Sequence, residues 1–122
     1  MRRIRSFLFL VAAAAGYSTS ALAHHGWSGN NSALELTGTV VSVVDLSGPH
    51  ATMQIEDTNG QVWNITLAPA PRTARAGLRV ETLAVGDQVT VTGSRNDDNA
   101  RFEIKTRRVQ RGDDIFDVYP PE

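Results

Sequence analysis

The chain of 122 residues contains no cysteine, and this absence removes several kinds of chemistry at once. Disulfide bonds, cysteine-ligated zinc sites and cysteine nucleophiles are excluded. The patterns of a serine nucleophile elbow, a zinc-protease helix and a phosphate-binding glycine loop do not occur either. We therefore expect a protein that is not an enzyme and that draws its stability from its own hydrophobic core.

Long hydrophobic runs are also missing, with one exception near the start of the chain. Arginines at positions 2, 3 and 5 precede an apolar stretch of ten residues, "FLFLVAAAAG" at 7–16. This stretch is shorter than the roughly 20 residues of a membrane-spanning helix, and Ala21-Leu22-Ala23 follows it as a small-x-small cleavage pattern. The three regions predict a signal peptide over 1–23. An uncleaved anchor or a short buried helix is the alternative.

Removal of this signal peptide would leave 99 residues, enough for one small domain. Residues 1–23 carry three of the 12 basic residues and none of the 13 acidic ones, so the mature chain has a formal net charge of −4. Such a surface does not attract polyanions, which argues against nucleic-acid binding. We expect a periplasmic or secreted protein whose mature form is not inserted in a membrane.

Short segments of alternating apolar and polar residues predict an all-β domain over 34–122. The expected strands cover 34–46, 51–56, 61–67, 88–94 and 100–110, with a short last strand at 115–119. Pro69 and Pro71 interrupt the sheet after the third strand, and 78–83 is expected to form a short helix. This order predicts a small five- to six-stranded OB-like β-barrel with one short helix or loop between strands three and four. Another small barrel or a sandwich is the alternative.

Smaller features give further expectations about this barrel. Gly38 is placed where the long first strand must bend, and Asn59-Gly60 indicates a type I′ hairpin turn. Residues 24–33 are polar and rich in glycine and asparagine, which predicts a flexible N-terminal arm. In the fifth strand, alternation places Phe102, Ile104, Thr106 and Arg108 on one face.

Three side chains outside the histidines also have predicted roles. Trp63 is expected in the core, and Asp87 is expected to cap backbone N–H groups at a turn. Three arginines near the proline-rich connection fit a solvated helix face or a clamp for an anion; they are Arg72, Arg75 and Arg79.

The candidate metal ligands are the three histidines, His24, His25 and His50. After removal of the signal peptide, His24 becomes the first residue, and its α-amine and imidazole can close a chelate ring on a metal ion. His25 adds a second imidazole, and His50 follows Pro49 in the turn after the first strand. A nitrogen-rich ligand set of this kind suits Cu(II), with Ni(II) and Zn(II) behind or alongside.

The N-terminal arm is long enough to bring these histidines together, because about ten extended residues span roughly 30 Å. Asp45, Glu56 and Asp57 are candidates for a carboxylate that completes the site, and the sequence does not choose among them. In the alternative interpretation, His24 and His25 are exposed residues beside a cleavage site. The ring of His50 then only donates a hydrogen bond to a carbonyl group.

Several segments together resemble a family of small exported bacterial proteins of unknown function. They are "AHHGWS" at 23–28, "LTGTVVSV" at 36–43, "GPHATMQIE" at 48–56, "LAPAPR" at 67–72 and "LAVGDQVTVTG" at 83–93. That family has an Ala-His-His mature start and an Asn-Pro-His turn. The resemblance implies export, a compact OB-like β-barrel and histidines at the positions of His24, His25 and His50. Gly48 stands where the family usually has asparagine.

Two functions follow from these observations. The first is a periplasmic metal-binding protein that stores, buffers or hands over an ion, with Cu(II) as the expected metal. The alternative is a non-catalytic OB-type binding or assembly module for a peptide, a glycan or another envelope partner, in which the histidines are incidental. A redox enzyme that uses an N-terminal copper site is a remote third possibility.

Overall fold

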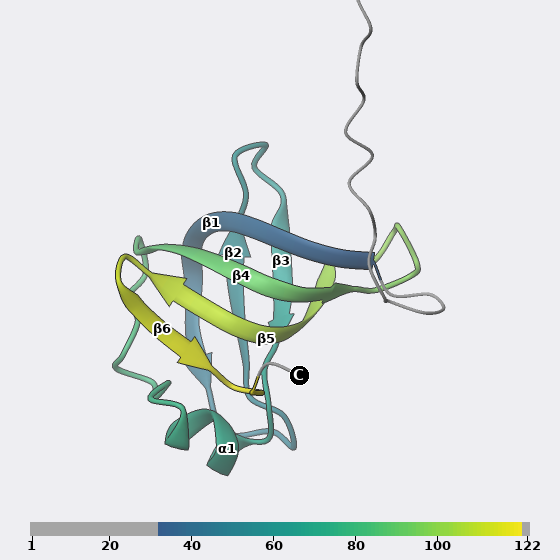
Figure 1. The fold of residues 1–122 in the computed structure, drawn as a ribbon. Helices are drawn as coiled ribbons and strands as arrows, with labels where there is room; N and C mark the ends of the chain where they lie inside the picture. Colours follow the sequence, from purple (N-terminus) through teal and green to yellow (C-terminus); the bar gives the residue numbers. More distant parts are fainter. Residues whose placement is uncertain (1–31, 121–122) are drawn as a thin grey trace, which may run out of the picture.

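The structure is a computed structural model, and it describes residues 32–120 (Figure 1). This part of the chain forms six β-strands and one short α-helix. In chain order they are β1 (Ser32–Asp45), β2 (Thr52–Glu56), β3 (Val62–Thr66), α1 (Ala70–Arg75), β4 (Gln88–Arg95), β5 (Glu103–Arg111) and β6 (Asp114–Asp117). No helix within residues 32–120 is long and apolar enough to cross a membrane. The predicted signal peptide over 1–23 and most of the predicted arm over 24–33 lie outside the described residues.

Five of the strands close into a barrel, which Figure 1 shows from the side. β1 pairs antiparallel with both β2 and β4, β2 pairs with β3, and β4 pairs with β5. β3 and β5 run parallel, and they close the barrel through Asn64–Glu103, Ile65–Ile104 and Thr66–Lys105. β6 adds an antiparallel strand at the outer edge of β5. The predicted all-β, OB-like barrel with a short helix between strands three and four is confirmed.

Alternating residues of the strands fill the barrel. Side chains at every second position point inward, as the period of two predicts. The fully buried ones include Val40, Val44, Met53, Ile55, Ile65, Val91, Ile104 and Val109. Burying such an aliphatic side chain contributes about 1.5–3 kcal/mol, so this set can stabilise the fold without a disulfide bond.

The long strand β1 belongs to both halves of the barrel, and Gly38 lies where it passes from one to the other. Residues 32–39 pair with β4, and the pairing with β2 begins at Thr39. A Cβ atom at position 38 would lie 2.6 Å from the carbonyl oxygen of Glu56. Glycine is therefore required for the close approach of β1 to the end of β2, at the position where the sequence predicted a bend.

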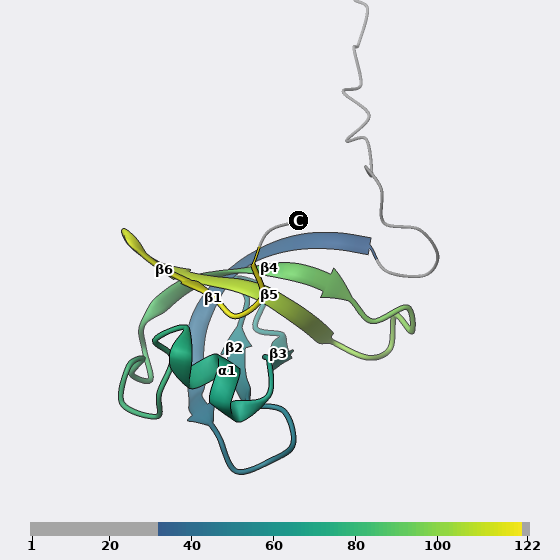
Figure 2. The same ribbon diagram turned by 60° about the horizontal axis from the view of Figure 1, so that its bottom comes forward.

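The short helix lies eight residues earlier than predicted. The helix is α1, Ala70–Arg75, and the segment 78–83 consists of turns that bury Leu78 and Leu83. Pro69 precedes the helix and Pro71 lies in its first turn, where a missing N–H costs no hydrogen bond and a fixed φ suits the helix. The prolines that end the sheet therefore also start the helix. Figure 2 shows α1 across one end of the barrel.

Two further predictions of local structure are wrong. The turn after β2 is not type I′, because that turn needs a positive φ at both central residues. Gly60 has φ +80°, but Asn59 does not have a positive φ. Asp57 and Gln61 close a three-residue loop instead, and Gly60 N–H donates to the Asp57 carbonyl. In β5, Arg108 is not on the face of Ile104. A bulge at Arg107 inserts one residue, so the next inward position is Val109.

Candidate functional site

The loop between β1 and β2, residues 46–51, carries His50 and lies at the end of the barrel that α1 covers (Figure 2). Its first turn is fixed by Asp45, whose Oδ1 accepts hydrogen bonds from the hydroxyl and the backbone N–H of Ser47, at 2.6 and 2.9 Å. These bonds, the hydroxyl first, lower the pKa of the Asp45 carboxyl. The last residue, Ala51, returns to the sheet by backbone hydrogen bonds to Leu67 and Ala68. Both ends of the loop are therefore tied to the barrel.

The imidazole of His50 is held by the backbone at the end of β3. Nδ1 lies 3.0 Å from the carbonyl oxygen of Leu67. A carbonyl oxygen only accepts hydrogen bonds, so Nδ1 is the donor in this pair, and in the neutral form of the ring the lone pair is on Nε2. The residue is exposed. Metal-binding histidines are commonly oriented in this way, by a hydrogen bond from the ring nitrogen that does not touch the metal. The contact is also the one expected of an incidental loop histidine.

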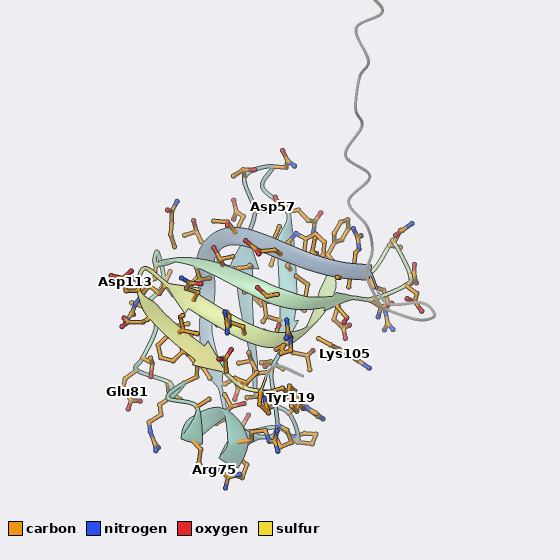
Figure 3. All side chains as sticks on the ribbon, in the orientation of Figure 1. Asp57, Arg75, Glu81, Lys105, Asp113 and Tyr119 are labelled. Carbon is orange, nitrogen blue, oxygen red and sulfur yellow. The ribbon has the colours of Figure 1, made fainter. Side chains whose placement is uncertain are left out.

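Two of the three candidate carboxylates lie far from His50. Glu56 ends β2 and Asp57 follows it, six and seven residues beyond His50, which corresponds to about 20 Å along an extended strand. Figure 3 shows Asp57 at the opposite end of the barrel from Arg75, which lies on α1. Ligands of one metal ion lie within about 2.5 Å of it, so neither residue can share an ion with His50. Asp45 remains at the same end of the barrel.

The other two predicted ligands, His24 and His25, lie outside the described residues. Within residues 32–120, no three or more histidine, cysteine or acidic side chains are grouped so that they could hold a metal ion. The described part of the chain therefore supplies His50 as a single oriented imidazole. Any complete metal site must include donors from outside it.

A polar groove lies on the outer face of β1, β2, β3 and β5, and it encloses about 480 Å³. Strand pairing arranges its side chains in two rows. Ser42, Gln54, Asn64 and Glu103 are paired in succession across the four strands. Asp45, Thr52 and Thr66 form a parallel row two residues away on β2 and β3 and three residues away on β1. The Gln54 side-chain amide donates to the Asn64 side-chain carbonyl at 2.8 Å. The first row thus contains two linked amides between a hydroxyl and a carboxylate.

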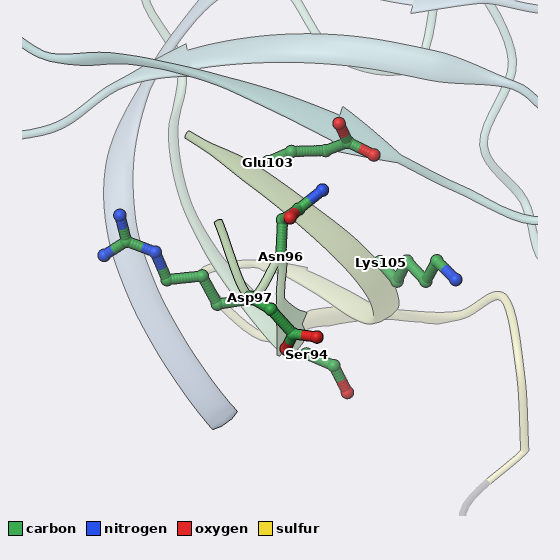
Figure 4. A pocket seen from close by; sticks show the side chains of 6 residues that line it. Ser94, Asn96, Asp97, Glu103 and Lys105 are labelled. Atoms are coloured by element: carbon green, nitrogen blue, oxygen red, sulfur yellow. The ribbon is translucent and has the colours of Figure 1, made fainter. Parts of the chain in front are cut away.

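A smaller hollow of about 170 Å³ lies where β4 ends and β5 begins (Figure 4). Asp97, Glu103 and Lys105 are its charged residues beside Arg95. In Figure 4 the charged ends of these three labelled side chains lie apart from one another, and Asn96 points toward Glu103. The hollow therefore offers no convergent set of ligands or catalytic groups.

Comparison with known families places the chain among proteins without an assigned activity. The model of "Family of unknown function (DUF6152)" matches residues 11–113. The chain belongs to this family. The matched region contains all three histidines and β1 to β5. The family of unknown function that the sequence motifs predicted is confirmed at this level, while export and the Ala-His-His mature start stay predictions.

Comparison with solved structures supports the fold of this DUF6152 member. The chain is similar to a protein described as "Crystal structure of the ZRD-deleted mutant of TiaS in complex with agmatine", with a TM-score of 0.53 and 19% sequence identity. The match covers 71% of this chain but only 26% of that one, so the chain spans about a quarter of the other protein. At this identity the similarity concerns the fold alone. No curated protein sequence matches the chain.

The structure also places the other residues that the sequence marked. Trp63 is 5% exposed and belongs to the core, as predicted. Asp87 caps its turn, because Oδ2 accepts the N–H of Ala84 at 2.9 Å, and it also pairs with Arg111 at 3.1 Å. Arg72 and Arg75 are exposed on α1, which agrees with a solvated helix face, and the Arg72 guanidinium lies 5.2 Å from the centre of the Tyr119 ring.

Sequence reasoning missed the polar groove. The alternation in 51–56 and 61–67 does show outward polar residues at Gln54 and Asn64. It does not show that Ser42 and Glu103 continue the same row, because that depends on the β1–β2 register and on the parallel β3–β5 pairing. The β1–β2 pairing has register shifts on both sides of Ser42, so the position of Ser42 beside Gln54 cannot be read from the sequence.

Proposed function

We propose that this protein is an exported metal-binding protein that holds Cu(II) with His24, His25 and His50. The observation that supports the proposal best is the orientation of His50. Its Nδ1 forms a hydrogen bond with the Leu67 carbonyl oxygen, which leaves Nε2 available to bind a metal ion. The residue is exposed at the end of the barrel. The barrel acts as a rigid carrier for this imidazole.

The remaining donors come from the mature N-terminus. An N-terminal His24 would supply its α-amine and its imidazole, and His25 would supply a second imidazole. With His50 these are four nitrogen donors, the number and type that a tetragonal Cu(II) ion prefers. The α-amine titrates near about 7.7–8.0, so a metal ion can displace its proton at neutral pH. The role of such a site is to store, buffer or hand over the ion.

The chain is long enough for these donors to meet. Ser32 pairs with Arg95, Arg95 with Ile104 and Ile104 with Ile65, which makes three strand spacings or about 14 Å. Leu67, which anchors His50, is two residues beyond Ile65, or about 7 Å further. The surface path from Ser32 to the His50 anchor is therefore about 21 Å. Eight extended residues between His24 and Ser32 span about 26–29 Å.

The proposal is tested by Cu(II) titration of the mature protein, residues 24–122, followed by visible absorption and electron paramagnetic resonance. Three variants are compared with it: one extra glycine before His24, His50→Ala, and Asn99→Ala as a control in the exposed turn between β4 and β5. We expect the mature protein to bind Cu(II) more tightly than about micromolar. The extra glycine and His50→Ala should each weaken binding about tenfold or more, and Asn99→Ala should leave it unchanged.

Two results separate the parts of this proposal. If the mature protein binds no better than about micromolar, or if all variants bind alike, the three-histidine site is wrong. If only the extra glycine weakens binding, the metal is held by the N-terminus alone, and His50 is the incidental loop histidine of the alternative interpretation.

The alternative function, a non-catalytic OB-type binding module, requires no metal. Its specific support is the groove on the outer face of β1, β2, β3 and β5, which does not include His50 among its lining residues.

A further inference from the structure

We propose that the polar groove over β1, β2, β3 and β5 binds an uncharged glycan chain. This inference does not depend on the three-histidine site, because His50 does not line the groove. The groove volume of about 480 Å³ falls in the range of ligand pockets, about 300–1,000 Å³. It also lies on the face of strands two and three with which OB folds bind oligonucleotides and oligosaccharides.

The charge and composition of the groove argue against a nucleic acid. Two of its lining residues, Asp45 and Glu103, are acidic, and none is basic or aromatic. Lys105 continues the second row after Thr66 but does not line the groove. Binding to a phosphate backbone requires cations, and binding to single strands depends on aromatic stacking. Of oligonucleotides and oligosaccharides, the groove therefore suits an uncharged oligosaccharide.

The backbone pairing argues against an extended peptide. Peptides commonly bind sheets by adding a strand to a free edge, where unpaired N–H and C=O groups are available. Beneath the groove, β2 is paired with β1 and β3, and β3 is paired with β2 and β5. Over β2 and β3 the groove thus presents side chains and no free strand edge. Its ligand must be held by side-chain hydrogen bonds across the strands.

The side chains of the first row fit the hydroxyl and acetamido groups of a glycan. The Gln54–Asn64 bond uses one donor of Gln54 and one acceptor site of Asn64, which leaves further N–H groups and the Gln54 carbonyl available. Because each amide is oriented by the other, less conformational entropy is lost when a ligand binds. Ser42 and Glu103 extend the row on either side, over about 14 Å in total. Sugar hydroxyls both donate and accept, so they can pair with all four side chains.

The test uses oligomers of β-1,4-linked N-acetylglucosamine, two to six sugars long, titrated into residues 24–122 labelled with ¹⁵N for NMR. The variants are the double change Gln54→Ala with Asn64→Ala, and Gln88→Ala as the matched control. Gln88 is an exposed amide at the start of β4 and does not line the groove. Cellohexaose, which lacks acetamido groups, a heparin oligosaccharide and an uncharged hexapeptide serve as comparison ligands.

We expect binding that strengthens with oligomer length, with amide shifts confined to β1 after residue 40, β2, β3 and the start of β5. The double variant should weaken it about tenfold or more, and Gln88→Ala should not change it. The proposal is overturned if neither neutral oligosaccharide binds at millimolar concentration, if the shifts lie elsewhere, or if heparin or the hexapeptide binds the groove more tightly. His50→Ala should leave glycan binding intact, and the double variant should leave Cu(II) binding intact, so failure of one proposal does not decide the other.

Discussion

The indole nitrogen of Trp63 donates a hydrogen bond to Oδ2 of Asp57 across the turn between β2 and β3, with 2.9 Å between the two atoms. Trp63 is buried, and a buried indole N–H needs an acceptor. The other oxygen, Oδ1, accepts the backbone N–H groups of Asn59 and Gln61, both at 2.9 Å. One carboxylate therefore satisfies three donors and joins the core to the hairpin turn.

Replacing Asp57 with alanine should destabilise the protein more than other changes in the same turn. The Trp63 N–H would lose its acceptor, and the turn would lose two bonds to Oδ1. We expect the midpoint of thermal unfolding, followed by circular dichroism, to fall by about 4–8 °C. Thr58→Ala, an exposed neighbour, should lower it by less than about 3 °C. Equal losses in the two variants would show that the carboxylate does not hold the turn.

Acid should weaken the fold through carboxylates of this kind. The Trp63 indole is the main cause of the lowered pKa of Asp57, while the Ala84 N–H and then Arg111 lower the pKa of Asp87. Because the folded-state pKa lies below the unfolded one, each group contributes stability above the unfolded pKa of about 4. That contribution is lost as the pH falls through the folded-state pKa.

The measurement is the urea midpoint between about pH 6 and pH 2. We expect the wild-type midpoint to decrease steadily below about pH 5. Asp87→Asn should lower the midpoint at pH 6 and should also show a shallower decrease, because an amide does not titrate. Asp113→Asn, in an exposed turn, is the matched control. A decrease as steep in Asp87→Asn as in the wild type would mean that Asp87 does not contribute to the acid response.

The strands of the barrel could be predicted because their alternation is strong and their breaks contain glycine, proline and asparagine. The sequence places the helix too late because the prolines at 69 and 71 look like breakers. Proline in a first helical turn has the opposite effect, and only the position of the helix start tells the two cases apart.

The bulge in β5 and the turn after β2 could not be predicted for a different reason. At Arg107 the extra residue has no local sequence signal, since it is set by the pairing of β5 with Gly93 on β4. In the turn, Asn59-Gly60 favours type I′, but the bonds from Asp57 to Asn59 and Gln61 stabilise a longer loop. Long-range contacts and a competing side chain decided these two features. The rows of the polar groove could not be predicted either, because they depend on the register between strands.

Gly93 is a position where any side chain should break the barrel. It faces the bulge of β5, and a Cβ atom there would overlap the backbone carbonyl oxygen of Lys105 and crowd the Cα of Thr106. Neither backbone atom can move without loss of the β4–β5 pairing. Gly93→Ala should cost at least about 3 kcal/mol in the free energy of unfolding, measured by urea titration. Gly48→Ala, in an exposed loop, should cost less than about 1 kcal/mol. A barrel that tolerates Gly93→Ala would contradict the close approach of the two strands.

The mature N-terminus decides whether the proposed copper site can exist, so the cleavage position is the most useful single measurement. We expect export of the full chain in a bacterial host to yield a protein whose mass corresponds to residues 24–122, because Ala21-Leu22-Ala23 fits a signal-peptidase site. Ala23→Asp, which places a charge where a small residue is required, should leave the signal peptide attached, while Thr19→Asp is a control outside the triplet. A mature chain that begins after His24 would lack the α-amine and imidazole of that residue as one chelating unit, and copper binding through it would be impossible. A chain that keeps residues 1–23 would have the same consequence, because a peptide bond would then occupy the His24 nitrogen.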